Sequence, residues 1–337
     1  MAVIGPFIEN GINPHLLKEY DLDIQMAVKV KSVIRAETQL GVFAVKKSLI
    51  SFNQAERMKE IIDYLTKNNF PVTSIIPNKY GEYFIPLTDG LFYVAKWIEG
   101  KEITLNHNPH LLKIISSLAE MHKLGFFFNP KDVHYRYVDE IYLRKSWQER
   151  IDWLKKYNKS LKKKANITTF EHIFSTYIPF LIDWAEEAVE HLSQWLIQYN
   201  SISGIRKTIS HGKLHHRNVL VKNGGEIVIL DFEHAGIDTP VRDLAYFIRH
   251  YILNKEHRIW AQEWVATYQK NVLLLVPEKK LLAIYLLFPE RLISLAKSYE
   301  KNDRNWSDDV YLKKLQVRWS QMKELLWFID QNQWLND

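Results

Sequence analysis

Short apolar runs alternate with turn residues in the first hundred residues, a pattern that predicts an antiparallel sheet. Residues 26–46 contain two or three β-rich runs that bend at Thr38-Gln39-Leu40-Gly41. Residues 83–86 and 91–97 supply two further short runs of the same kind. Between these groups, residues 53–67 repeat apolar side chains at helical spacing. The pattern therefore predicts a sheet of about five strands accompanied by one helix.

Apolar positions in the rest of the chain mostly follow helical spacing. The segment from Leu111 to Gly125 predicts an amphipathic helix that ends at a capping glycine. Residues 168–199 form a long helical stretch rich in Trp and Phe. After Ala245 the pattern is again helical, and Pro277 and Pro289 are expected to separate helices.

These elements together indicate an α+β chain with two lobes. Residues 1–98 are expected to form a small N-lobe with a five-stranded antiparallel sheet and one helix. Residues 99–337 are expected to form a large, mainly helical C-lobe. With 337 residues, of which 47% are hydrophobic, the chain can fill the cores of both lobes.

The most informative stretch runs from Ile209 to Ala245. Two short apolar runs, residues 219–221 and 227–230, flank Asn223-Gly224-Gly225, which is a strong hairpin signal. Polar residues precede the first run and Asp231 follows the second. A hairpin would turn both sets of polar groups toward the same space, where an amide and a carboxylate can hold a divalent ion.

This stretch resembles the catalytic and metal-binding segments of the aminoglycoside phosphotransferase and choline-kinase superfamily, which shares the protein-kinase fold. The family pattern is His-Gly-Asp-Leu-His, two variable residues and Asn, then Ile-Asp-Phe and, further on, Asp-Leu-Ala. The matching positions are His211, Gly212, Leu214, His215, Asn218, Asp231, Phe232, Asp243, Leu244 and Ala245. Where the family has its catalytic Asp, this chain has Lys213.

The resemblance implies catalytic positions at His211, Lys213 and Asn218, and a magnesium site at Asn218 and Asp231. A lysine at position 213 has hydrogen-bond donors only, so it cannot accept the proton of a substrate hydroxyl, and its charge repels a metal ion. We expect it to face inward, with Asp231 or a bound phosphate as its partner. Strong phosphotransfer is therefore not expected, although some transfer could survive the loss of a general base.

The resemblance also implies a nucleotide site formed by the N-lobe. Lys46, at the end of the run Val42-Phe43-Ala44-Val45, matches the strand lysine that contacts the α- and β-phosphates. Its partner carboxylate is expected on the following helix, at Glu60 or Glu56. The segment Trp97-Ile98-Glu99-Gly100 matches the hinge, whose backbone would face an adenine ring, or it is a plain strand-to-helix turn.

Two further observations qualify this site. Between Val28 and Glu37 the chain has Lys29, Lys31 and Arg35 but no glycine, so the phosphate-covering glycine loop is missing. We expect the binding of ATP and Mg²⁺ to be weak or absent. His122, in the matched helix pattern Leu-Ala-x-Met-His-x-x-Gly, is expected to pack between helices.

Composition excludes several classes of protein. The chain has no cysteine, so it has no disulfide framework and no thiolate site. No apolar run reaches the length of a membrane span, and the N-terminus shows no signal-peptide pattern. These features favour synthesis in the cytoplasm.

The net charge of +6 is concentrated in residues 131–166, which hold eleven Lys or Arg against five Asp or Glu. Aromatic residues, among them Tyr135, Tyr137 and Tyr157, are interleaved with the charges, and Lys162-Lys163-Lys164 closes the segment. Such a segment is most often a solvated helix face with a basic loop, and alternatively binds an anionic polymer. A nucleic-acid partner is not expected.

Within the superfamily, the missing glycine loop, the run Leu40 to Lys47 and the Trp-Ile-Glu-Gly hinge resemble bacterial spore-coat proteins of the CotS family, in particular their YsxE- and YutH-like branches. The resemblance implies a protein deposited on the spore coat, with other coat proteins as partners. It leaves the acceptor substrate unknown.

Three hypotheses follow. The first is a coat-associated pseudokinase with weak or no phosphotransfer. The second is an active small-molecule phosphotransferase that depends on ATP and magnesium, in which His215 or Glu233 replaces the missing base. The third is a module that binds an anionic polymer through residues 131–166.

Overall fold

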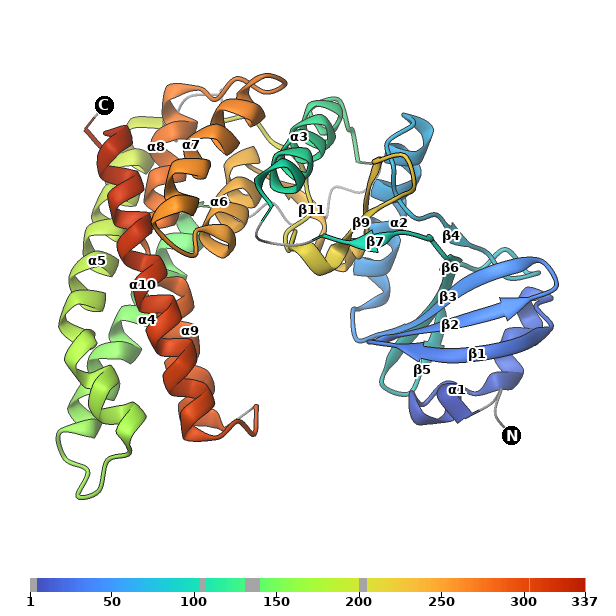
Figure 1. Ribbon diagram of the computed structural model, residues 1–337, viewed down its shortest axis with the longest axis horizontal. Coiled ribbons are helices and arrows are strands. Elements are labelled where there is room, and N and C mark those ends of the chain that lie inside the picture. The colour runs from blue at the N-terminus through green and yellow to red at the C-terminus, as the bar shows by residue number, and fades with distance from the viewer. Residues whose placement is uncertain (1–4, 104–106, 131–139, 200–204, 303, 337) are drawn as a thin grey trace. The chain divides into compact units, whose positions relative to one another are not determined.

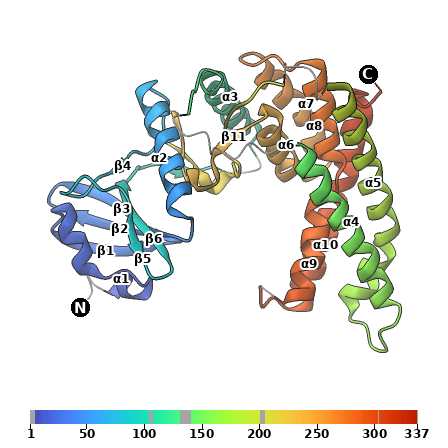
Figure 2. The same cartoon turned by 180° about the vertical axis from the view of Figure 1, so that it is seen from behind.

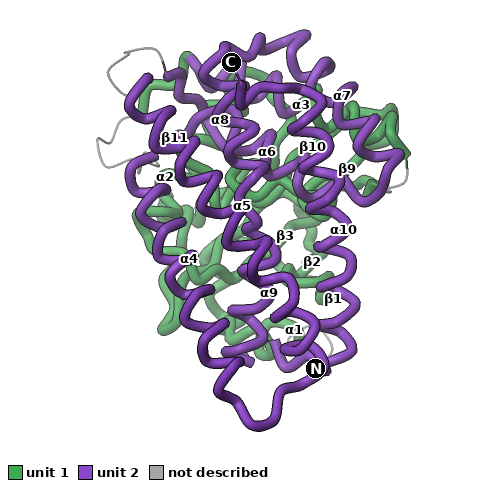
Figure 3. The backbone as a smooth tube through the Cα atoms, turned by 90° about the vertical axis from the view of Figure 1, so that its left-hand side faces the viewer, with its two compact units in different colours: residues 1–117, 127–135, 211–236 green, residues 118–126, 136–210, 237–337 purple. Residues whose placement is uncertain are grey.

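A computed structural model describes residues 5–103, 107–130, 140–199, 205–302 and 304–336 (Figure 1). The chain divides into two compact units, coloured separately in Figure 3. The first unit contains residues 1–117, 127–135 and 211–236, and the second contains 118–126, 136–210 and 237–337. This division differs from the single boundary after residue 98 that the sequence suggested, and that lobe boundary stays a prediction.

The first unit is built on an antiparallel sheet of six strands. Its order is β1-β2-β3-β6-β4, and β5 also pairs with β6. The bounds are β1 Ile24–Val30, β2 Val33–Thr38, β3 Gly41–Ser48, β4 Ile75–Ile76, β5 Ile85–Leu87 and β6 Gly90–Lys96. The antiparallel sheet and the α+β class are thus confirmed. The count is six instead of about five, because the two-residue strand β4 is too short to leave an alternating pattern.

The N-terminal segment completes a core with this sheet. It forms the helix α1, Gly5–Glu9, and the 3₁₀ helix η1, Pro14–Tyr20. Phe7 and Leu17 from this segment are buried with Ile34, Val45 and Phe92 of the sheet in one apolar cluster. Burying a side chain of this size contributes about 1.5–3 kcal/mol, so the cluster stabilises the sheet.

Helix α2, Phe52–Lys67, is the helix expected between the strands. It begins at a capping box, in which the Ser51 hydroxyl accepts from the Gln54 backbone N–H and the Gln54 side chain accepts from the Ser51 N–H. Its buried face includes Met58, Ile61 and Leu65. The apolar spacing in the sequence therefore marks the face that packs inward.

The predicted hairpin is present and belongs to the first unit. Strands β9, Val219–Val221, and β10, Ile227–Ile229, pair antiparallel, and β7, Lys101–Glu102, pairs with β9 on its other side. Gly224 and Gly225 both have positive φ, which is why the turn needs glycine. The 3₁₀ helices η2, His216–Asn218, and η3, Phe232–His234, flank the hairpin.

The second unit is mainly helical (Figure 2). Helix α3, Asn108–Gly125, belongs partly to each unit, and strand β8, Thr208–Ser210, pairs with β11, Gly236–Asp238. The remaining helices are α4 Glu140–Leu161, α5 Thr169–Tyr199, α6 Pro240–Tyr251, α7 Lys255–Gln269, α8 Val276–Leu287, α9 Glu290–Lys301 and α10 Asp308–Asn332. Pro277 lies in the first turn of α8, and Pro289 is the N-cap of α9, as expected for helix boundaries. None of the described helices combines the length and the apolar character that crossing a bilayer requires.

Candidate active site

A cavity of about 880 Å³ lies within the first unit, bounded by the sheet, α2, the hinge segment and the hairpin. Its lining includes six of the residues singled out from the sequence: Lys46, Trp97, Ile98, Glu99, Asn218 and Asp231. These residues come from three segments, and the segment with Asn218 and Asp231 lies more than a hundred positions after the other two. The structure therefore brings the strand lysine, the hinge and the two proposed metal ligands to one cavity.

Lys46 lies at the centre of an ion-pair cluster. Its ammonium is 2.6 Å from an oxygen of Asp231 and 3.0 Å from an oxygen of Glu233. Tyr93, which faces Lys46 across the β3–β6 pair, donates its hydroxyl to Glu233 at 3.3 Å. All three charged side chains are largely buried, so this cluster is a stronger electrostatic feature than a surface ion pair.

Asp231 is held in an unusual backbone conformation at the end of β10. Its φ is 64°, in the left-handed region that few non-glycine residues adopt. Burial alone would raise the pKa of its carboxyl, but the charge and the hydrogen bond of Lys46 outweigh burial and lower the pKa below its ordinary value. Asp231 is therefore ionised at neutral pH and paired with the Lys46 ammonium.

The loop before the hairpin is fixed by hydrogen bonds to the hairpin itself. His211 is buried, and its Nε2 lies 2.9 Å from the backbone oxygen of Leu230. The Asn218 backbone oxygen accepts from the Leu230 N–H at 2.8 Å, which ties Asn218 to the residue preceding Asp231. Gly212 has φ of 75°, and a Cβ there would lie 2.4 Å from the His234 backbone oxygen. Only glycine fits this close approach.

Lys213 is exposed at the surface of the first unit. Its backbone participates in the loop, because its N–H donates to His211 Nδ1 and its carbonyl accepts from the Asn218 amide, both at 3.3 Å. Its ammonium forms no ion pair with any residue that the structure describes. Asp231 is held by Lys46, and Lys213 is not among the residues that line the cavity. The expectations that Lys213 faces inward and that it pairs with Asp231 are therefore wrong.

The partners of Lys46 were only partly visible in the sequence. Asp231 was singled out as a metal ligand and Glu233 as a possible base, but neither was assigned to Lys46. The pairing of Lys46 with Glu60, or with Glu56, stays a prediction; Glu56 is exposed on α2.

The turn at the edge of the cavity replaces the missing glycine loop. Val30 pairs with Val33, so only Lys31 and Ser32 connect β1 to β2, and Lys31 adopts a positive φ of 57°. Lys31 forms an ion pair with Glu102, and Arg35 forms ion pairs with Glu37 and Glu99. Both basic side chains are thus already engaged by carboxylates, and the two-residue turn presents few backbone amides.

Two histidines of the loop have environments that keep them neutral. Burial, followed by the charge of His216, lowers the pKa of His215. Burial and the neighbouring Arg217 lower the pKa of His216. His215 lines the cavity, and its Nδ1 is buried without a partner among the described residues. A neutral imidazole in this place can accept a proton.

Only a small donor set could hold a metal ion here. Among the described residues, no three His, Asp or Glu side chains converge as a metal site. The side-chain N–H of Asn218 donates to the Lys213 carbonyl, so the side-chain oxygen of Asn218 is the atom that could bind a cation. Asn218 would supply an amide oxygen and Asp231 a carboxylate to a magnesium ion, whose other ligands would come from phosphate oxygens and water.

His122 and the Asp-Leu-Ala motif lie in the second unit. His122 is fully buried, with Nδ1 2.6 Å from the Tyr268 hydroxyl and Nε2 3.3 Å from Asp243. Its expected role as a residue that packs between helices agrees with this environment.

The basic segment is described only from Glu140 onward, because Tyr135 and Tyr137 lie outside the described residues. Its described part is the amphipathic helix α4, which buries Trp147, Leu154 and Tyr157. At the end of the segment, Lys164 is bound by both oxygens of Glu171. The lysine run is therefore partly neutralised.

Solved structures of small-molecule kinases share this fold. An aminoglycoside phosphotransferase from Alicyclobacillus acidocaldarius is 17% identical with a TM-score of 0.79, covering 96% of this chain and 97% of its own. An amicoumacin kinase in complex with AMP-PNP, Ca²⁺ and Ami is 14% identical with a TM-score of 0.63, covering 95% of this chain and 96% of its own. The choline kinase LicA from Streptococcus pneumoniae is 16% identical with a TM-score of 0.55, covering 94% and 99%.

The family described as spore coat putative kinase YutH matches residues 13–331, nearly the whole chain. This match agrees with the resemblance to spore-coat relatives of small-molecule kinases that the sequence motifs carry. The chain belongs to the family of spore coat putative kinases of the YutH type.

Proposed function

We propose that this protein is a component associated with the spore coat, and that its kinase-like site transfers phosphate weakly or not at all. The observation that carries the proposal is Lys213 at the position where the resemblance places the catalytic Asp. The hydrogen bonds of His211, of the Lys213 backbone and of Asn218 hold the loop that contains it. At position 213 this loop offers an ammonium in place of a group that accepts a proton. The family assignment supports association with the coat.

The chemistry of lysine explains the expected loss of activity. Its ammonium offers donors only and stays charged at neutral pH, so it cannot take the proton of an acceptor hydroxyl. General-base assistance is worth about 10²–10⁴ in rate, so a site without it is slow even when the nucleotide is held.

The ion-pair cluster supports weak nucleotide binding. The strand lysine that would contact phosphates is neutralised by two carboxylates, Asp231 and Glu233. Binding a nucleotide with Mg²⁺ would have to exchange these contacts for phosphate and metal contacts, which costs part of the gain. We therefore expect ATP and Mg²⁺ to bind weakly if they bind.

Synthesis in the cytoplasm followed by deposition on the coat is part of the same proposal. Other coat proteins are the expected partners. Such a role needs a stable surface and does not need turnover.

An active phosphotransferase is the second candidate, and one observation favours it. His215 lines the cavity and is kept neutral by its lowered pKa, so it could serve as the base. Glu233 is a poorer candidate, because Lys46 and Tyr93 both hold its carboxylate. A module for anionic polymers is less well supported, since Glu171 binds Lys164.

The test is a phosphotransfer assay with γ-labelled ATP, magnesium and a panel of amino sugars, choline and amino alcohols. We expect no acceptor-dependent transfer by the natural protein. Rapid transfer that disappears in His215→Gln would establish the active alternative. Salt-sensitive binding to a polyanion, lost when Lys162 and Lys163 are changed to Gln, would establish the third.

A further inference from the structure

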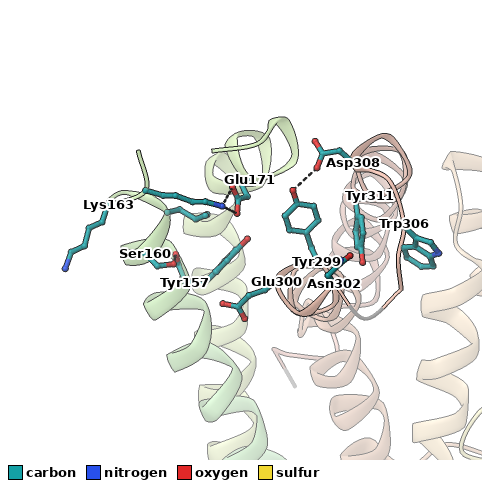
Figure 4. Close-up of a pocket in the computed structure, with 12 residues that line it drawn as sticks. Tyr157, Ser160, Lys163, Glu171, Tyr299, Glu300, Asn302, Trp306, Asp308 and Tyr311 are labelled. Atoms are coloured by element: carbon teal, nitrogen blue, oxygen red, sulfur yellow. Dashed lines mark hydrogen bonds and ion pairs between the residues drawn. The ribbon is translucent and has the colours of Figure 1, made fainter. Parts of the chain in front are cut away.

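A second cavity, of about 750 Å³, lies within the second unit and involves none of the residues discussed above for phosphotransfer. It is formed where the end of α4 and the start of α5 meet the end of α9 and the start of α10 (Figure 4). Glu140, at the start of α4, binds Lys207 just before β8. Because a helix of 22 residues is about 33 Å long, the cavity lies far along the unit from β8.

Tyr157 lies at the floor of this cavity with its hydroxyl unsatisfied. The residue is 5% exposed, and its hydroxyl oxygen is buried with no hydrogen-bond partner among the described residues. Figure 4 shows this hydroxyl directed into the space between the two helix pairs. An unpaired buried hydroxyl costs about 1–3 kcal/mol, so a group that bonds to it would recover this energy.

The cavity walls combine carboxylates with aromatic rings. Glu171, Glu300 and Asp308 supply the charges, and Tyr299, Tyr311 and Trp306 supply the rings. Lys164 neutralises Glu171, whereas Lys163 extends away from the cavity (Figure 4). Each remaining carboxylate accepts only neutral donors among the described contacts: Trp153 Nε1 on Glu300, and the Tyr299 hydroxyl and the Phe170 N–H on Asp308.

The electrostatics at the floor favour a positive ligand group. Burial is the main reason that the pKa of Tyr157 is raised, and the charges of Glu171 and Glu300 raise it further. Glu300 carries a charge that no cation offsets among the described contacts, so a positively charged donor suits the space beside the hydroxyl. Aromatic faces beside carboxylates are also the surroundings that organic cations prefer.

We propose that this cavity binds an alkylammonium group, held by the Glu300 carboxylate and the Tyr157 hydroxyl against the surrounding rings. The group could be carried by a lysine side chain of a partner protein or by a free diamine. Both sources share the primary ammonium, and the experiment separates them.

The test is calorimetric titration of the full chain with Nα-acetyl-lysine-N-methylamide and, separately, with cadaverine. Binding of the lysine derivative assigns a peptide-borne lysine, and binding of cadaverine alone assigns a free diamine; either result supports the proposal. The derivative acetylated on its ε-nitrogen should not bind. Equal binding of that neutral derivative, or no heat from either amine at millimolar concentration, would overturn the proposal.

Two variants locate the site. Tyr157→Phe and Glu300→Gln should each weaken amine binding about tenfold, the equivalent of one hydrogen bond to a charged group. Glu300→Gln keeps a side-chain oxygen for Trp153 Nε1, and Tyr157→Phe removes only an unpaired hydroxyl, so both should fold. Glu187→Gln makes the same charge change on α5 outside the cavity and should bind as the natural protein does. Amine binding that is unaltered in both site variants would place the ligand elsewhere and refute the assignment.

Discussion

The ion-pair cluster around Lys46 and the cavity around Tyr157 differ in whether their charged groups meet a partner of opposite charge. In the first, one ammonium, two carboxylates and the Tyr93 hydroxyl contact one another. In the second, a buried hydroxyl lacks a partner and two carboxylates meet no cation among the described contacts. The charged groups of the Lys46 cluster thus satisfy one another, while the Tyr157 hydroxyl and the carboxylates beside it have unused binding capacity.

The largest expected effect is on stability, from removing the ammonium that joins the first cluster. Lys46→Ala would leave Asp231 and Glu233 buried beside each other, and the free energy of unfolding should fall by about 3–5 kcal/mol. Urea unfolding followed by circular dichroism measures it. Lys47→Ala is the matched control on the same strand, because Lys47 pairs with the exposed Asp89 and its loss should be far smaller. Equal losses would mean that the cluster contributes no more than a surface pair.

Lowering the pH should remove part of the stability that the ion pair between Lys46 and Asp231 contributes. The pKa of Asp231 is lower in the folded protein than its ordinary value of 3.8. The stability that its ionised form contributes is therefore present above pH 3.8 and is lost as the pH falls through the folded value. The destabilisation caused by Asp231→Asn should shrink as unfolding is measured from pH 7 down to pH 3. A difference that stays constant would show that the Asp231 pKa is not lowered by Lys46.

Substituting Gly212 should lower the free energy of unfolding by less than the loss of the Lys46 ion pairs, but by a measurable amount. Gly212→Ala places a Cβ 2.4 Å from the His234 backbone oxygen at positive φ, so the loop must shift. We expect a loss of about 1–3 kcal/mol in urea unfolding. Gly224→Ala also has positive φ but meets no atom within 4 Å, and it should lose less. A smaller loss at Gly212 than at Gly224 would contradict the packing described for this loop.

The smallest expected effects come from removing the hydroxyl of Tyr93 and, separately, the hydroxyl of Tyr157. Tyr93→Phe removes a hydrogen bond to Glu233 and should lower the free energy of unfolding by about 1 kcal/mol. Tyr157→Phe removes a buried hydroxyl without a partner, so the free energy of unfolding should rise by about 1 kcal/mol, the low end of the cost of an unpaired hydroxyl. Thermal unfolding of both variants distinguishes the two cases. A clear loss in Tyr157→Phe would show that its hydroxyl is satisfied in solution.

The sequence predicted those parts of the site that are local in the chain. The hairpin around Gly224 follows from a short pattern of residues and is present. Lys46 and the hinge from Trp97 also follow from short patterns and line one cavity, while their roles toward a nucleotide stay predictions. The partners of Lys46 did not follow, because Asp231 lies 185 residues away in the chain. No spacing rule connects such distant positions.

The sequence could predict neither the orientation of the Lys213 side chain nor the second cavity. The motif fixes the backbone of residue 213, through its bonds to His211 and Asn218, but not the direction of a long side chain. Tyr157 belongs to a segment whose charge predicted a solvated helix face, whereas its side chain is buried. The helical spacing of Trp147, Leu154 and Tyr157, which places them on one face of α4, could have indicated that Tyr157 is buried.

The central claim is that the charge at position 213 impairs the kinase-like site, and the most direct measurement is the calorimetric affinity for ATP with magnesium in Lys213→Asp. Exchanging a positive for a negative charge near the ion should tighten binding by about tenfold or more. Lys18→Asp makes the same exchange at an exposed position of η1 outside the cavity and should leave the affinity as it is in the natural protein. An affinity that Lys213→Asp does not change would contradict the claim, because residue 213 would then lie too far from the ion to govern it.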